Sequence, residues 1–184
     1  TNPTRAIALD GSVANSASAL GANQSTRYLY ASNFGFSIPS DANINGIVAT
    51  VDRYQSSGSQ RIWDNSVRLV KAGSAVGSDK ASATLWGTTT ATATYGSTTD
   101  LWGTTWTPAQ INASNFGFKI SAKHSSSTTT KSAYIDYISI TVTYTLPVDI
   151  NAPVTTASGY STDWNKSNQN VTLTCVDVGS AGCV

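Results

Sequence analysis

A run of oxygen-bearing side chains after position 40 is the first pattern that could do chemistry. An acid and two amides alternate before a glycine, and a second acid stands at the twelfth position: Asp41, Asn43, Asn45, Gly46 and Asp52. This is the ligand spacing of a helix-flanked Ca²⁺ loop. That loop ends in Glu, which binds the ion with both side-chain oxygens, whereas the twelfth residue here is Asp52. That loop also lies between helices, whereas the flanking residues here alternate as strands do. A polar turn that enters a strand explains the same residues, so we expect no metal and keep these residues as the single Ca²⁺ alternative.

The sequence contains few residues that could form a catalytic site. The only histidine, His124, lies in a Ser- and Thr-rich run that we interpret as a mobile polar loop. A serine hydrolase needs its histidine held by an acid and aimed at one activated serine, and the G-x-S-x-G elbow is absent from the sequence. Ten scattered Asp and no Glu do not suggest the carboxylate pair of a glycosidase. One His and two late Cys do not make a zinc site, so we expect no catalytic site and no cofactor.

The tryptophans could bind sugars. Trp86 and Trp102 are each followed by Gly and lie in or beside loops. Exposed indoles there would stack on sugar rings, as in carbohydrate-binding sandwiches. The alternative is that the indoles close the ends of a core. We favour the core for Trp102 and Trp106, which flank a short capped helix, and leave Trp86 and Trp63 open.

Two further features are typical of an extracellular chain. Cys175 and Cys183 lie close together, and we favour a disulfide between them over two free thiols or partners elsewhere. Four sequons match N-glycosylation sites, although a Ser- and Thr-rich chain often produces such matches by chance: Asn23, Asn112, Asn165 and Asn170. We therefore expect a location outside the cell, at a cell or virion surface.

Composition indicates the fold class. Charged residues make up 11% of the 184 residues, well below the usual quarter or so, and there is no Glu and no Met. Ser and Thr, which suit sheet surfaces and turns, are abundant instead. This favours an all-β protein. A net charge of +1 gives no general attraction for nucleic acid, and no apolar stretch reaches the roughly 18 residues of a membrane span. We expect neither a nucleic-acid partner nor membrane insertion.

Alternation of apolar and polar residues predicts the strands. Ile47, Ala49 and Val51, for example, should face a core together. The predicted strands of the first part of the chain cover 5–9, 25–30, 34–38, 46–54, 66–71, 90–95, 116–120 and 138–146. They fit a two-sheet antiparallel β-sandwich that is jelly-roll-like.

An exact repeat supports a two-layer arrangement. The hexapeptide at 31–36 recurs letter for letter at 113–118, and Ile38 is matched by Ile120. The alternation of Phe and Ile in both copies predicts two equivalent strands. Between the copies, Thr107-Pro108-Ala109-Gln110 predicts one short helix, with a cap hydroxyl, a Pro at the first helical position and a Gln three residues after the cap.

The alternation stops at two closely spaced prolines. This predicts a sandwich domain over 1–146, a linker over 147–153 and a partial immunoglobulin-like β segment over 154–184. Two strands, 154–157 and 171–175, are predicted in that segment. Since two strands enclose no core, the segment is either incomplete or completed by another chain.

The stretch from Tyr30 to Thr145 resembles a β-sandwich module of bacterial, archaeal and phage surface and fibre proteins. The matching pieces are 31–39, 44–47, 64–71, 100–108 and 133–138, and the tail from Val171 to Cys183 looks like the opening of an immunoglobulin-like repeat. The resemblance implies a tail-fibre, adhesin or stalk part, and no catalytic residues come with it.

These observations predict a non-catalytic extracellular structural or adhesive protein. We expect a subunit of a surface filament, pilus-like fibre or phage tail appendage, whose C-terminal strands pair with neighbouring subunits or domains. The alternative is a carbohydrate-binding module of a larger secreted protein, with glycans bound through Trp86 and Trp102.

Overall fold

A computed structural model describes residues 2–148, 150, 152–164, 167–177 and 183. The chain divides into two compact units, Thr1–Thr145 and Leu146–Val184. No described helix is of a length and apolarity that would carry it through a bilayer.

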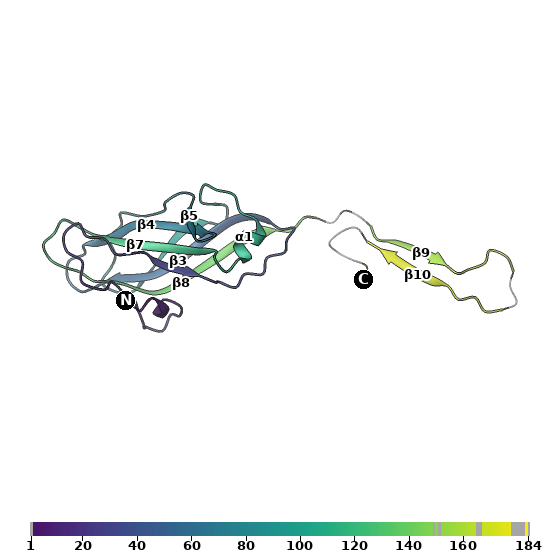
Figure 1. The fold of residues 1–184 in the computed structure, drawn as a ribbon, viewed down its shortest axis with the longest axis horizontal. Helices are drawn as coiled ribbons and strands as arrows, with labels where there is room; N and C mark the ends of the chain where they lie inside the picture. The colour runs from purple at the N-terminus through teal and green to yellow at the C-terminus, as the bar shows by residue number, and fades with distance from the viewer. Residues whose placement is uncertain (1, 149, 151, 165–166, 178–182, 184) are drawn as a thin grey trace. The chain divides into compact units, whose positions relative to one another are not determined.

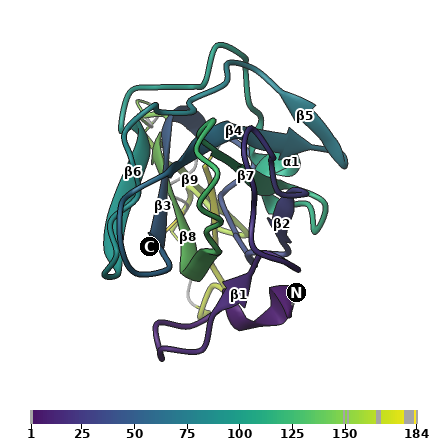
Figure 2. The same cartoon turned by 90° about the vertical axis from the view of Figure 1, so that its left-hand side faces the viewer.

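The first unit is a sandwich of two four-stranded antiparallel sheets (Figures 1 and 2). One sheet has the order β1-β8-β3-β6, and the facing sheet has the order β2-β7-β4-β5. The strands are β1 (Ala14–Asn15), β2 (Leu29–Ser32), β3 (Asn43–Gln55), β4 (Ile62–Lys71), β5 (Ser74–Val76), β6 (Ala91–Ser97), β7 (Gly117–His124) and β8 (Ala133–Thr145). This order is that of an eight-stranded jelly roll, so the predicted all-β sandwich is confirmed. Nearly every connection crosses between the sheets, which brings residues far apart in sequence into one core.

The core consists of the inward positions of both sheets. Ile47, Ala49 and Val51 are fully buried, as their alternation predicts. Facing them are Val67 and Leu69 of β4, together with Phe118 and Ile120 of β7. Burial of these side chains is the main stabilising term of the sandwich.

The predicted strand over 5–9 is wrong. Pro3–Arg5 forms a short 3₁₀ helix (η1), and only Ile7 makes an isolated bridge, to Tyr137. Pro3 favours the helical start because its ring fixes φ near the helical value. The side chains of Ile7 and Leu9 are exposed, so apolar residues at alternate positions did not produce a buried strand here.

The two copies of the hexapeptide adopt different structures. The second copy runs into β7, whereas the first leaves β2 after Ser32 and continues as an irregular segment. Asn33 and Gly35 have φ values of 60° and 72°, which interrupt the alternation of a strand. The prediction of two equivalent strands is therefore wrong. The copies still meet, because the Phe34 and Phe36 rings lie 6.3 and 5.9 Å from the Phe116 ring.

The one short helix is confirmed as α1 (Pro108–Asn112). The Thr107 hydroxyl accepts a hydrogen bond from the Gln110 N–H at 3.3 Å, and the Gln110 side chain accepts one from the Thr107 N–H at 3.1 Å. This reciprocal pair is a capping box. Next to it, the Trp106 ring lies edge-on to Phe116 at 5.3 Å.

The second unit contains a two-stranded antiparallel hairpin, β9 (Val154–Ser158) and β10 (Thr172–Val176). All ten strand residues are exposed. The predicted disulfide is confirmed: Cys175 and Cys183 are bonded, with their Cα atoms 6.2 Å apart.

Candidate functional site

A buried carboxylate joins the two sheets at one end of the core. Asp64 of β4 has a fully buried side chain. One of its oxygens accepts hydrogen bonds from the Arg53 guanidinium of β3 and from the Trp86 indole N–H at 2.9 Å. The other accepts from the Tyr95 hydroxyl of β6 and from the Ser82 N–H, each at 3.0 Å. Both oxygens are thus saturated by four donors from three segments: β3, β6 and the loop between β5 and β6.

The electrostatics of this Asp64 cluster favour a structural role. The Arg53 guanidinium also lies 4.7 Å from the Trp86 ring centroid, a cation–π distance. Burial, together with the Asp64 charge, raises the pKa of the Tyr95 hydroxyl. A carboxylate whose acceptor positions are all occupied has no free position from which to take a substrate proton. The sequence analysis missed this cluster. Alternation carried back from the inward Val67 and Leu69 would place Asn65 inward, but a register shift between Asp64 and Ser66 turns Asp64 to the core instead.

The structure corrects the interpretation of His124 as part of a mobile loop. His124 is the last residue of β7, pairs with Ile62 of β4 and is 0% exposed. Its Nδ1 lies 2.8 Å from the Ser125 carbonyl oxygen, and its Nε2 has no hydrogen-bond partner among the described residues. The imidazole therefore lies on the core side of β7 and not in a polar loop.

The two tryptophans predicted to stack on glycans are buried. Trp102 is 0% exposed, and its indole N–H donates to the Ile47 carbonyl at 2.8 Å. Trp86 is 2% exposed and belongs to the Asp64 cluster. Neither indole presents a face on which a surface sugar could stack, so the core alternative holds for Trp102, and it holds for Trp86 as well. Of the residues left open, Trp63 is half-buried on the outer side of β4.

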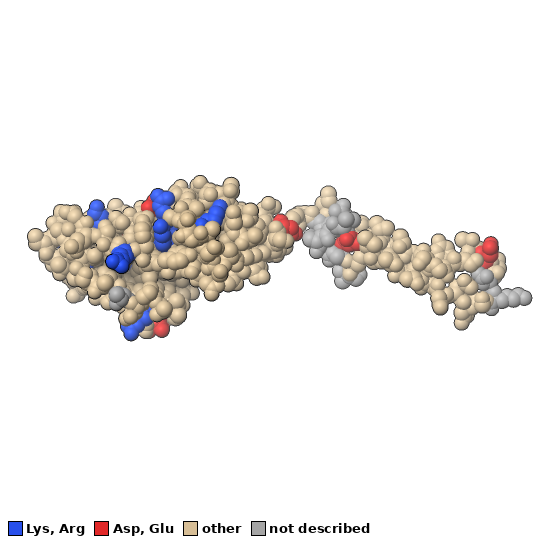
Figure 3. All heavy atoms as spheres, in the orientation of Figure 1, with Lys and Arg blue, Asp and Glu red and all other residues tan. Residues whose placement is uncertain are grey.

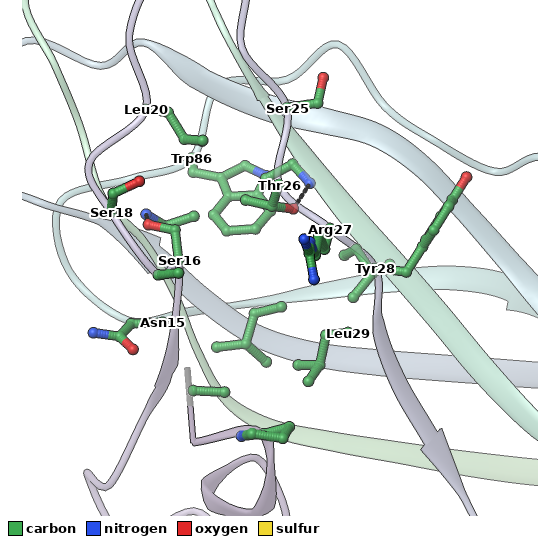
Figure 4. A pocket seen from close by; sticks show the side chains of 17 residues that line it. Asn15, Ser16, Ser18, Leu20, Ser25, Thr26, Arg27, Tyr28, Leu29 and Trp86 are labelled. Atoms are coloured by element: carbon green, nitrogen blue, oxygen red, sulfur yellow. Dashed lines mark hydrogen bonds between the residues drawn. The ribbon is translucent and has the colours of Figure 1, made fainter.

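Trp86 does line a cleft of about 400 Å³ between the edge strands β1 and β2. Much of its lining is apolar and includes Leu20, Leu29, Ile120, Ala122, Ala133 and Ile135. In Figure 4, the side chains of Trp86, Arg27 and Leu29 face the same hollow, whereas the Tyr28 ring extends away from it. Ser16, Ser18 and Ser25 add hydroxyl groups to the lining. The cleft suits a small apolar group better than a sugar ring, because almost none of the indole is reachable.

The Ca²⁺ candidates do not converge. Asn43 and Asn45 lie at the start of β3, and Asp52 lies seven positions after Asn45 in the same strand, which is roughly 23 Å away. The Asp52 carboxylate accepts a hydrogen bond from the Thr92 hydroxyl instead. No group of three or more His, Cys or Asp side chains is positioned for a metal anywhere in the described part of the chain.

The sequons differ in their surroundings. Asn23 is exposed in the loop before β2, and Asn170 is exposed before β10. The side chain of Asn112 is engaged, since its amide donates to the Ile38 carbonyl at 2.8 Å and accepts from the Ile38 N–H at 2.9 Å. Asn165 lies outside the described residues.

Comparison with known proteins gives no relative. No family model matches the chain, and neither a curated protein nor a solved structure matches it significantly.

Proposed function

We propose that this chain is a non-catalytic structural or adhesive part of an extracellular assembly, such as a surface filament or fibre. In it, the hairpin β9–β10 pairs with strands of a neighbouring copy. The disulfide supports an extracellular location, because such bonds persist in oxidising compartments. The Asp64 cluster supports a structural use of the buried charges, as all four of its partners hold strands or loops together.

The observation that carries the proposal is the exposure of the hairpin. Leu173 is 69% exposed, and Val154, Val171 and Val176 are more than half exposed. A two-stranded sheet is marginal in water, and each of its strands has one edge without a partner among the described strands. Such an edge pairs readily with another strand, and burial of the apolar side chains would add to the main-chain hydrogen bonds.

Light scattering coupled to size exclusion tests this proposal. The molar mass should rise with protein concentration, and Leu173→Lys should return the chain to a monomer by placing a charge at the new contact. Leu9→Lys is the matched control, because Leu9 is 66% exposed but belongs to the first unit. A monomer at every concentration, or equal effects of the two variants, would contradict pairing between copies.

Carbohydrate binding is the second candidate function. It no longer rests on Trp86 and Trp102, because both are buried. The observation that favours it is a different set of aromatic residues on the outer face of the β2-β7-β4-β5 sheet. Tyr28 and Tyr30 are 48% and 45% exposed, and Trp63 is half-buried.

A further inference from the structure

The two outer faces of the sandwich differ in charge although the whole chain is nearly neutral. β6 and β8 contain no Lys or Arg, and the only cation of β3, Arg53, points into the core. The opposite face carries Lys119 and Lys123 on β7 and Arg68 on β4. Figure 3 shows that side of the sandwich, with Lys and Arg spread over it and few acidic side chains among them.

Pairing register places an aromatic ring beside each lysine of β7. Tyr30 of β2 lies directly across from Lys119, and Trp63 of β4 lies directly across from Lys123. The Lys119 ammonium is also 4.3 Å from the Tyr28 ring centroid. Outward positions alternate along β7, so the two lysine–aromatic groups lie on one face. Exposed Asn65 lies between them and donates to the Ser121 hydroxyl at 3.0 Å.

The charge of both lysines is available to a ligand. Three ion pairs occur in the described part of the chain, Arg53–Asp64, Arg68–Asp79 and Lys80–Asp100, and none of them involves Lys119 or Lys123. Burial would raise the pKa of Asp79, but hydrogen bonds from Val67, Ser66 and Ala81 and the Arg68 charge hold it below its usual range. Asp79 is therefore ionised at neutral pH and offsets Arg68.

We propose that this strip, formed by Tyr28, Tyr30, Trp63, Asn65, Lys119 and Lys123, binds an acidic polysaccharide. The carboxylates of the glycan pair with the lysines, and its sugar rings lie against the aromatic side chains. The proposal deepens the adhesive role proposed above by naming the ligand class and the face that binds it.

Cation spacing argues for a glycan over a nucleic acid. Lys119 and Lys123 are four residues apart along β7, or roughly 13 Å, whereas a nucleic-acid strand carries one phosphate about every 3.4 Å of helix axis. Two separated cations match a polymer whose charges are sparse, such as one with a carboxylate on every second sugar. A flat sheet face also suits an extended chain that lies along the strand.

Affinity electrophoresis of the full chain tests the proposal, with hyaluronate as the acidic probe and dextran as the neutral one. Hyaluronate should retard the protein and dextran should not. Lys119→Ala combined with Lys123→Ala should weaken binding about tenfold, as expected for the loss of two exposed charge pairs. Arg5→Ala is the control for loss of a positive charge elsewhere: it removes one cation from η1, which packs against β1 of the other sheet, and it should leave binding unchanged.

Trp63→Ala separates glycan recognition from simple charge attraction. It leaves the net charge unchanged and should still weaken hyaluronate binding about tenfold, whereas Trp63→Phe should retain most of it. Near-ultraviolet circular dichroism checks that each variant is folded. Equal retardation by dextran, no retardation by hyaluronate, or stronger binding to an oligothymidylate probe would overturn the proposal. Self-association is read separately by light scattering, so either proposal can fail alone.

Discussion

At the scale of single residues, the buried Asp64 side chain accepts four hydrogen bonds, all of which serve the fold. Asp64 takes a charged group into the core, which is costly unless its partners are in place. Arg53, Trp86 and Tyr95 supply those partners from two strands and a loop. The same contacts hold the Trp86 indole in the core and away from solvent.

Asp64→Ala is expected to destabilise the sandwich by about 3–5 kcal/mol, because it leaves the Arg53 charge buried without a counter-ion. Urea unfolding followed by tryptophan fluorescence measures the change in the free energy of unfolding. Lys80→Ala is the control: it breaks an ion pair of 2.6 Å whose side chains are about one-third exposed. That loss should be at most about 1 kcal/mol. Similar losses in the two variants would show that the Asp64 cluster is not a major support of the fold.

At the scale of elements, β2 and β7 approach each other closely next to the pair Tyr30 and Lys119 of the binding strip. Gly117 opens β7, and a Cβ there would lie 2.4 Å from the Ala31 carbonyl oxygen and 2.7 Å from the Tyr30 ring. A side chain at this position would push β2 away from β7. Glycine is thus required by packing here, while its counterpart in the first hexapeptide, Gly35, is required by its φ of 72°.

Gly117→Ala should cost about 1–3 kcal/mol of stability, the range expected for overpacking, because the contact is with backbone that cannot rotate away. Thermal unfolding followed by circular dichroism gives the size of the effect. Gly21→Ala serves for comparison: its new Cβ would approach only the flexible Gln24 side chain, at 3.6 Å. We expect little change there. A fully stable Gly117→Ala protein would refute the close approach of β2 and β7.

At the scale of the whole molecule, the two units have different sources of stability. The sandwich rests on a core shared by eight strands, whereas the second unit has ten exposed strand residues and one disulfide. The disulfide closes a short segment between Cys175 and Cys183 and restrains the unfolded chain only there.

Reduction of this disulfide should therefore leave the main thermal transition of the sandwich unchanged. Differential scanning calorimetry with and without a reducing agent measures this, and the double variant Cys175→Ser, Cys183→Ser should behave as the reduced protein does. Reduction should still loosen the hairpin, seen as faster amide exchange in Thr172–Val176. A lower transition temperature of the sandwich on reduction would mean that the two units share stability.

The sequence by itself determined the fold class, six of the eight sandwich strands at least in part, the capped helix and the disulfide. These depend on local patterns: alternation within a strand, a capping box within four residues, and two cysteines eight positions apart. The sequence analysis also excluded nucleic acid from a net charge of +1, although a net value does not show how charges divide between two faces.

Only the tertiary structure decided where the chemically interesting side chains lie. Identical hexapeptides became a strand in one place and an irregular segment in the other, because different neighbours surround each copy. Trp86 and His124 are buried by strands distant in sequence, and Tyr30, Lys119 and Arg68 are placed side by side by the strand order. Since most paired strands of this jelly roll are not consecutive in the sequence, no local pattern could have specified these contacts.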